Sequence, residues 1–192
     1  SKPASHGSPP KFANQSVRKN KFIKLINALD FGEAFFLTLL TDKHMHPQLV
    51  KDVKTWKSWL NKFRSRFMYQ FKRGFLVWKV ELDTDGLGLH FHMIASPCCE
   101  VSKGDIQEWT NRTWSRIVGS SWSRLVDVQD YTPEHEGYLF RNVKSEREAG
   151  LLRHLQGHYY FGLFGRKNAR YHRELKYTVS AQGMQYVRKL IC

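Results

Sequence analysis

The chain has 192 residues, of which 41% are hydrophobic and 14% aromatic, so it is long enough for one domain with a substantial core. Its 31 Lys and Arg residues against 17 Asp and Glu give a net charge of +14, which favours a polyanionic partner, with nucleic acid first. No apolar run approaches the roughly 20 residues of a spanning helix, and no basic helix has an exposed apolar face, so we expect no membrane partner.

The N-terminal residues and the cysteines indicate the compartment. Residues 1–20 are polar, basic and proline-containing, without the apolar segment of a secretory signal, so we expect a cytoplasmic protein. The three cysteines include the adjacent pair Cys98 and Cys99, which fits neither a disulfide framework nor a zinc-ligand spacing.

Residues 1–15 lack periodicity, and we expect a disordered basic arm there, followed by a single domain over residues 16–192.

The first predicted elements are a helix and an apolar strand. Ser16 is a typical N-cap for a helix whose apolar positions, Phe22, Leu25, Ile26 and Leu29, recur at helical spacing. Residues 33–41 then read Glu-Ala-Phe-Phe-Leu-Thr-Leu-Leu-Thr, which predicts a strand in the middle of a sheet.

The clearest helix is predicted from Pro47 to about Arg73, with Gly74 ending it. Its apolar stripe has steps of three and four and consists of Leu49, Val53, Trp56, Leu60, Phe63, Phe67 and Phe71. The other faces are basic, with Lys51, Lys54, Lys57, Lys62, Arg64, Arg66, Lys72 and Arg73. Solvated charge is the simplest explanation for any one of them, but the single sign along the helix favours a nucleic-acid contact.

Two histidines in the next segment are the main candidate for chemistry. Residues 75–82 and 87–95 both read as strands, and the turn-rich residues 83–88 between them predict an antiparallel hairpin. His90 and His92 then point to one face, because strand side chains alternate. If Leu82 faces Leu89, Glu81 faces His90 and Lys79 faces His92. A carboxylate and two imidazoles on one patch predict a metal site with positions open for water or a phosphate oxygen.

The two histidines can also have a purely structural role. A His-x-His pair in a strand is a short motif that often occurs without a metal, and a one-residue slip of the register would turn Glu81 away. His44 and His46 form a second such pair, but no strand aligns them, so we interpret them as surface residues or at most a phosphate contact.

The second half of the chain completes an α+β pattern. A helix is predicted over residues 103–118, with Ile106, Trp109, Thr113 and Ile117 inward and Gly119 ending it, and a strand over 124–129. The elements up to this point predict a central antiparallel sheet covered by helices. We further expect a helix at 145–156, a short strand at 159–164, a basic loop at 166–173, a strand at 174–179 and a final helix capped by Ser180.

These residues resemble the HUH superfamily of endonucleases, which initiate rolling-circle replication of plasmids and small phages. The apolar strand with an embedded threonine, Phe35 to Thr41, is similar to that family's first motif, and His90-Phe91-His92 is similar to its second. The long basic helix between them and the segment from Tyr160 to Asn168 also resemble such replication proteins. The resemblance covers roughly residues 20–190 and implies an RRM-related fold.

The resemblance also implies a mechanism. A divalent ion, Mg or Mn, would be held by His90, His92 and a polar third ligand, for which Glu81 is the best match. A tyrosine hydroxyl would attack the scissile phosphate of DNA, leaving a 5′-phosphotyrosine and a free 3′-hydroxyl. No other cofactor is implied.

The nucleophile motif is where the sequence departs from this family. The stretch that otherwise aligns, residues 149–157, contains no tyrosine. Tyr138, followed by Arg141, gives a weaker version of the pattern, and Tyr159 and Tyr160 lie beyond the aligned position. All three tyrosines can instead serve in aromatic packing.

Three functions follow as hypotheses. The first is a replication initiator that nicks single-stranded or hairpin origin DNA and works with a host helicase or polymerase. The second is a regulator or inhibitor derived from this family that binds nucleic acid without cleaving it, and the third is a metallonuclease that uses metal-bound water. The residues predicted to contact nucleic acid are Lys54, Lys57, Arg64, Lys79, Arg141, Arg166, Lys167 and Arg170.

Overall fold

The structure is a computed structural model that describes residues 20–83, 88–120, 125–140 and 160–172. Its central feature is an antiparallel sheet. Its five strands lie in the order β5-β2-β4-β3-β6. They are β2 (Phe35–Leu40), β3 (Phe75–Leu82), β4 (Leu89–Ser96), β5 (Val126–Asp130) and β6 (Phe161–Phe164). The predicted α+β class with a central antiparallel sheet is confirmed. Strand β2 is an interior strand, with β5 and β4 beside it, and β4 occupies the middle position.

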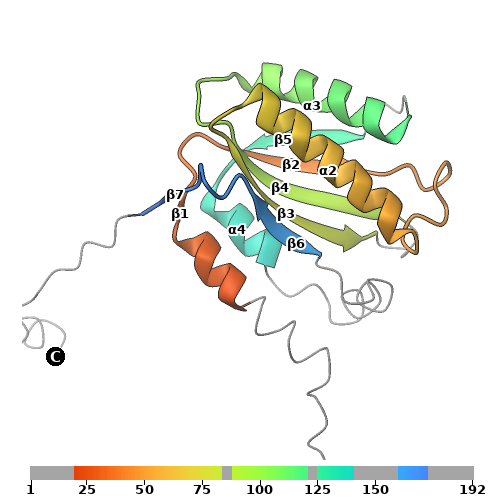
Figure 1. The fold of residues 1–192 in the computed structure, drawn as a ribbon, viewed down its shortest axis with the longest axis horizontal. Helices are drawn as coiled ribbons and strands as arrows, with labels where there is room; N and C mark the ends of the chain where they lie inside the picture. Colours follow the sequence, from red (N-terminus) through yellow and green to blue (C-terminus); the bar gives the residue numbers. More distant parts are fainter. Residues whose placement is uncertain (1–19, 84–87, 121–124, 141–159, 173–192) are drawn as a thin grey trace, which may run out of the picture.

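Two long helices connect strands that are not neighbours. Helix α2 (Val53–Gln70) joins β2 to β3, with β4 between them, and α3 (Lys103–Val118) joins β4 to β5, with β2 between them. This is the split βαβ arrangement, in the order βαββαβ. Both helices lie on the same side of the sheet (Figure 1).

The side of the sheet under α2 and α3 holds the larger core. Leu37 and Leu39 of β2 and Phe91 of β4 are fully buried there. They pack with aromatic residues of the two helices, Trp56, Trp59, Phe63, Phe67 and Trp114. The apolar stripe predicted for the long helix is therefore its buried face.

The opposite side is covered over part of its area by a helix over residues 20–27 and by α4 (Pro133–Phe140). Ile26 and Leu139 of these helices pack with Phe36, Val77 and Ile94 of the sheet. Helix α4 was not predicted as a helix. Leu29, predicted as helical, lies instead in β1 (Leu29–Asp30), which pairs with β7 (Arg170–Tyr171) inside the predicted basic loop.

The helix boundaries follow from their caps. Helix α2 begins at Val53 rather than Pro47, because the Asp52 carboxylate accepts a hydrogen bond from the backbone N–H of Thr55 at 3.0 Å. It ends at Gln70, before Gly74, where a Cβ atom would lie 2.9 Å from the Ser96 carbonyl oxygen. Helix α3 has the predicted bounds, and Gly119 ends it with a φ of 73°.

Several predicted elements lie outside the described residues. They are the basic arm, the helix at 145–156, the strand at 174–179 and the final helix. Within the described parts of the chain, no helix has the length and apolar character that crossing a bilayer requires.

Candidate functional site

The hairpin of β3 and β4 has the predicted register. Leu82 pairs with Leu89, Glu81 with His90, and Lys79 with His92. Because side chains alternate along strands, these charged and imidazole groups share one face of the sheet, opposite the face under α2 and α3. We call the set Lys79, Glu81, Asp83, His90 and His92, with Thr38 of β2, the histidine site.

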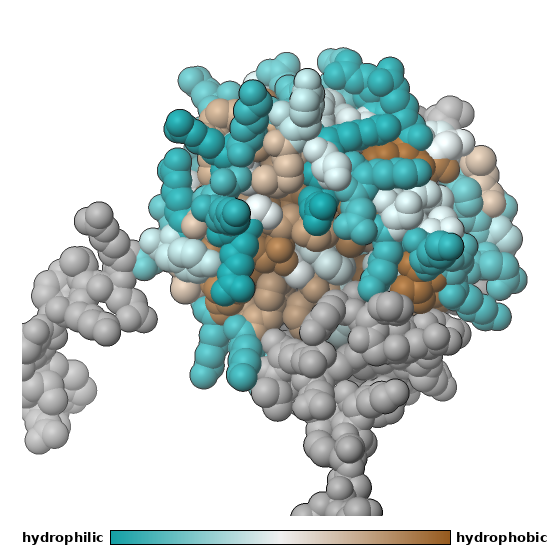
Figure 2. All heavy atoms as spheres, in the orientation of Figure 1, coloured by the Kyte–Doolittle hydropathy of each residue, from teal (hydrophilic) through white to brown (hydrophobic). Residues whose placement is uncertain are grey.

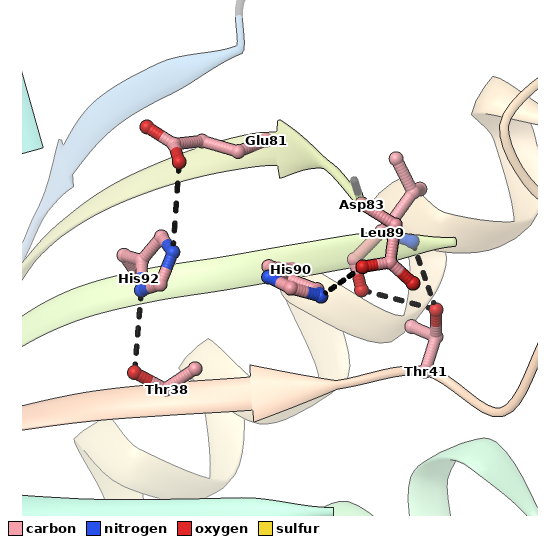
Figure 3. Close-up of polar contacts among 7 residues, drawn as sticks. All are labelled: Thr38, Thr41, Glu81, Asp83, Leu89, His90 and His92. Atoms are coloured by element: carbon pink, nitrogen blue, oxygen red, sulfur yellow. Dashed lines mark hydrogen bonds and ion pairs between the residues drawn. The ribbon is translucent and has the colours of Figure 1, made fainter. Parts of the chain in front are cut away.

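His92 lies at the centre of the histidine site and is 4% exposed. Its Nδ1 forms a 3.2 Å hydrogen bond with the Thr38 hydroxyl, and its Nε2 lies 3.6 Å from Glu81 Oε2. Figure 3 shows Thr38 and Glu81 on opposite sides of the ring. Burial lowers the pKa of His92 to about 4, although the Glu81 carboxylate acts in the opposite direction. The imidazole is therefore neutral at pH 7, which is the form that binds metals.

His90 occupies the more open end of the histidine site. Its side chain is 30% exposed, and its Nε2 lies 2.6 Å from Asp83 Oδ1 (Figure 3). The ring centroids of His90 and His92 are 6.0 Å apart, with the rings edge to face. Asp83 was predicted only as a turn residue, and its position directly after β3 was the one signal for this role.

Lys79 does not have the predicted role of a nucleic-acid contact. It is 1% exposed, and its ammonium group forms an ion pair with Glu81. Its side chain lies on the histidine face of β3 and is 2% exposed, so the ammonium group is not available to a nucleic acid at the surface. Lys79 therefore balances the charge of Glu81 inside the sheet.

The donors of the histidine site suit a divalent ion in their chemistry, since it combines imidazole nitrogens with carboxylate oxygens. Within the described residues, however, no three His, Cys, Asp or Glu side chains converge on one ion. Glu81 contacts Lys79 and His92, whereas His90 contacts Asp83. The structure thus brings the three predicted ligands to one face and gives each histidine a carboxylate neighbour.

A cavity of about 650 Å³ opens beside His90. Asp83 and the loop after β2 complete its lining, with Thr41, Asp42, Lys43 and His44. The Thr41 hydroxyl donates to the Leu89 carbonyl oxygen at 3.0 Å and accepts from the Leu89 N–H at 3.1 Å. A single buried side chain therefore fixes the start of β4, one residue before His90.

The second histidine pair is divided between two environments. His46 bonds through Nε2 to the Val118 carbonyl oxygen at 3.1 Å and packs edge-on against Trp59. His44 is exposed and lines the cavity beside His90. The prediction of a surface position holds for His44, whereas His46 anchors its loop to the end of α3.

Helix α4 lies against the same face as the histidines. The His135 ring stacks on Phe36 with centroids 4.4 Å apart, and Phe36 stacks on His92 at 5.7 Å. The Tyr131 hydroxyl donates a hydrogen bond to Glu136 of α4, and burial, together with this contact, raises the pKa of Tyr131. These contacts place a helix that contains Tyr138 over the sheet, although the Tyr138 side chain lies outside the described parts.

The structure describes one of the other two candidate tyrosines, Tyr160, and it does not lie at the histidine site. Tyr160 is 3% exposed and belongs to the core under α2 and α3, where the Val80 N–H donates to its carbonyl oxygen. Its burial supports a role in packing, and we do not retain it as a nucleophile. Tyr159 lies outside the described residues, as does Arg141.

The remaining predicted nucleic-acid contacts lie on the surface. Lys54 and Arg64 are exposed on α2, and Lys57 is partly exposed there. Arg166, Lys167 and Arg170 are exposed in the segment from β6 to β7. None of these cations belongs to the histidine site. Lys54, Lys57 and Arg64 lie on α2, which covers the opposite face of the sheet, and Arg170 lies in β7, which pairs with β1.

Comparison of the chain with protein-family models, with curated proteins and with solved structures gave no match.

Proposed function

We propose that the protein is a metal-dependent endonuclease of the HUH type that nicks single-stranded DNA at a replication origin. The observation that carries this proposal is the pairing of β3 with β4. It aligns His90 and His92 on one face, with Glu81 directly across from His90. The βαββαβ strand order supports the proposal, because the resemblance to this family implies an RRM-related sheet.

His90, His92 and Glu81 would hold the divalent ion, Mg or Mn, with Asp83 as a further oxygen donor beside His90. When bound, such an ion offsets negative charge on the scissile phosphate. Thr38 fixes the orientation of the His92 ring through its Nδ1. Because burial lowers the pKa of His92 to about 4, that ring is ready to bind a cation without first losing a proton.

Tyr138 is the nucleophile that this arrangement favours, because its helix packs on the histidine face. Its phenol oxygen forms a bond to phosphorus while the bond from phosphorus to the 3′ oxygen breaks. The phenol proton passes to solvent, and the 3′ oxygen takes up a proton to become a hydroxyl. A polymerase can extend that hydroxyl, and the protein stays attached to the 5′ end.

Two observations on the histidine site favour a second function. Glu81 already forms an ion pair with Lys79, and the described donors do not converge on one ion. Such a site fits a protein that has kept the fold and the basic surface but regulates or inhibits by binding nucleic acid. In that case steeply salt-dependent binding would occur without cleavage.

Formation of a covalent adduct between the protein and DNA distinguishes the two functions. The protein is incubated with 3′-labelled single-stranded DNA and Mn, because the 3′ label stays on the fragment that the protein would hold, and a band shifted by the mass of the protein is sought in a denaturing gel. We expect the adduct with the parent chain and its loss in Tyr138→Phe, with Tyr159→Phe and Tyr160→Phe as comparisons. Tyr171→Phe is a matched control, because Tyr171 is an exposed tyrosine far along the chain in β7. Cleavage without any adduct would favour metal-bound water, and binding without cleavage would favour the regulator.

A further inference from the structure

The outer face of α2 is a strongly basic surface, and it lies apart from the histidine site. No Asp or Glu occurs from Val53 to Gln70, and the residues that point away from the core include Lys54, Lys57, Lys62 and Arg66. In Figure 2 hydrophilic side chains cover much of the region where Figure 1 shows α2 and α3. The α2 basic surface, as we call it, consists of Lys54, Lys57, Lys62, Arg64, Arg66, Tyr69, Arg112, Arg116 and Arg166.

Three adjoining hollows make this surface continuous. One of about 740 Å³ lies along α2, one of about 450 Å³ lies between α2 and α3, and one of about 620 Å³ lies between α2 and β6. Ser65 lines all three hollows, and Tyr69 lines the second and third. The surface therefore runs from the N-terminal half of α2 to both of its neighbours without an interruption.

The charges of this surface are largely uncompensated. Within the described residues, Glu108 is the one carboxylate that forms an ion pair with any of these cations, at 3.6 Å from Arg112. Arg66 donates to the Thr113 carbonyl oxygen at 3.3 Å, and Arg64 lies over the Phe164 ring at 5.3 Å. Such contacts hold the side chains in place but leave their positive charge available to an anion.

An exposed aromatic ring stands among these cations. Tyr69 is 82% exposed and lines the same hollows as Arg66, Arg112 and Arg166. Proteins that bind single strands combine a cationic path for the backbone with aromatic faces on which bases stack. A duplex keeps its bases stacked internally, and an anionic membrane would require a larger exposed apolar area.

We infer that the α2 basic surface binds a single-stranded nucleic acid, with its cations on the phosphates and Tyr69 stacked on a base. This surface is separated from the histidine site by the sheet itself, because α2 and α3 cover the opposite face. A nucleic acid bound at this surface is therefore either a different segment of the molecule that is bound at the histidine site or a second nucleic-acid molecule. Binding here does not depend on cleavage.

The test measures binding in conditions that prevent cleavage. The full chain with Tyr138→Phe is titrated, in EDTA, against a fluorescent oligothymidylate of about 15 nucleotides, a length within the range that single-strand-binding surfaces cover. Fluorescence anisotropy is recorded at several salt concentrations. A failure of the proposed nicking activity leaves this measurement unaffected.

Charge removal on the surface is compared with the same charge removal elsewhere. For Lys54→Gln/Lys57→Gln/Lys62→Gln, we expect binding at least about tenfold weaker and a salt slope smaller by about 2, because three phosphate contacts to a single strand are lost. The control, Lys21→Gln/Lys24→Gln/Lys103→Gln, removes exposed lysines outside the surface, and we expect a change within about twofold. Equal losses in both triple variants would overturn the inference.

Substitutions of Tyr69 test whether the surface prefers a single-stranded nucleic acid, whose bases can stack on this ring. Tyr69→Ala is expected to weaken binding about tenfold, whereas Tyr69→Phe keeps the stacking face and is expected to bind within about twofold of the parent. Circular-dichroism melting of each variant confirms its fold. An unchanged affinity in Tyr69→Ala, tighter binding to a duplex of the same length, or binding to phosphatidylserine vesicles that the oligonucleotide does not displace would each contradict the proposal.

Discussion

On one face of the five-stranded sheet, under α2 and α3, the buried side chains are almost all apolar, whereas on the other face charged and imidazole groups stand among apolar ones. Lys79 and His92 are as deeply buried as many core residues. Buried polar groups add little stability compared with apolar residues of the same volume. The contrast indicates that the first face supplies most of the apolar burial that stabilises the fold, and the second carries the groups on which the proposed metal binding depends.

The pairing on the histidine face supports this distinction. Charged groups there are paired: Glu81 pairs with Lys79, two residues before it in β3, and His90 pairs with Asp83, directly after β3. A sheet that needed only stability would carry β-branched or aromatic residues at these positions. Four substitutions or conditions test the contrast between the two faces, in order of decreasing effect on the free energy of unfolding.

The largest effect is expected on the face under α2 and α3. Phe63→Ala removes a fully buried ring that packs on Trp109 and Trp114, and we expect a loss of about 3–5 kcal/mol in urea denaturation. Asn61→Ala, exposed on the same helix, is the control and should change stability by less than about 0.5 kcal/mol. Similar values for the two variants would remove the basis for assigning this face to the core.

Acid should destabilise the protein through His92. Its pKa is lowered from 6.5 to about 4 in the folded chain, so the unfolded state binds the proton more readily. Stability from this group is complete above pH 6.5 and is lost as the pH falls towards 4, by about 3 kcal/mol at 1.36 kcal/mol per pKa unit.

The measurement for His92 is the difference between two pH profiles. Urea denaturation in EDTA is followed from pH 7.5 to pH 4 for the parent chain and for His92→Gln. Carboxylates titrate in both proteins, so the difference reports the histidine. Parallel profiles would show that His92 is not held neutral by burial.

The Thr41 hydroxyl should stabilise the fold by holding Leu89, the residue before His90, in place. Thr41→Val removes both hydrogen bonds to Leu89 and leaves a buried N–H and carbonyl without that partner, at an expected cost of about 1–3 kcal/mol. Thr41→Ser retains the hydroxyl and should recover most of the loss. If the serine and valine variants are equally unstable in denaturant, the hydroxyl does not fix the start of β4.

His90→Ala is expected to have the smallest effect on stability and a large effect on DNA nicking. His90 has a partly exposed side chain, so His90→Ala is expected to change the free energy of unfolding by less than about 1 kcal/mol. Nicking of single-stranded DNA in Mn should fall about a hundredfold or more, because a proposed ligand of the metal ion is lost. Loss of nicking with unchanged stability would support different roles for the two faces of the sheet, whereas full activity would exclude His90 as a metal ligand.

The elements that sequence predicted well are those whose signals are local. The apolar stripe of α2 and the bounds of α3 follow from periodicity and, at the end of α3, from Gly119. The hairpin register followed from the alternation around His90 and from the turn after Leu82. Helix α4 was missed because its eight residues include Pro133 and Gly137 and show little periodicity.

The site was predictable only in part, because contacts between side chains decide the rest. The register placed Lys79 opposite His92, but it could not show that the lysine is buried and paired with Glu81. Asp83 beside His90 and Tyr160 in the core depend on how the sheet packs. The contact of α4 with Phe36 joins residues about a hundred positions apart, for which the sequence carries no local signal.

The role of the histidine face in nicking can be tested by identifying the residue that carries DNA after cleavage. The parent chain, His90→Ala and His92→Gln are each incubated with single-stranded DNA and Mn, digested, and examined by mass spectrometry for a peptide bearing a nucleotide. We predict a modified peptide containing Tyr138 in the parent and no modified peptide in either histidine variant. A modified peptide in all three chains, or cleavage by the parent without any modified tyrosine, would contradict the assignment of the histidine face to tyrosine-dependent nicking.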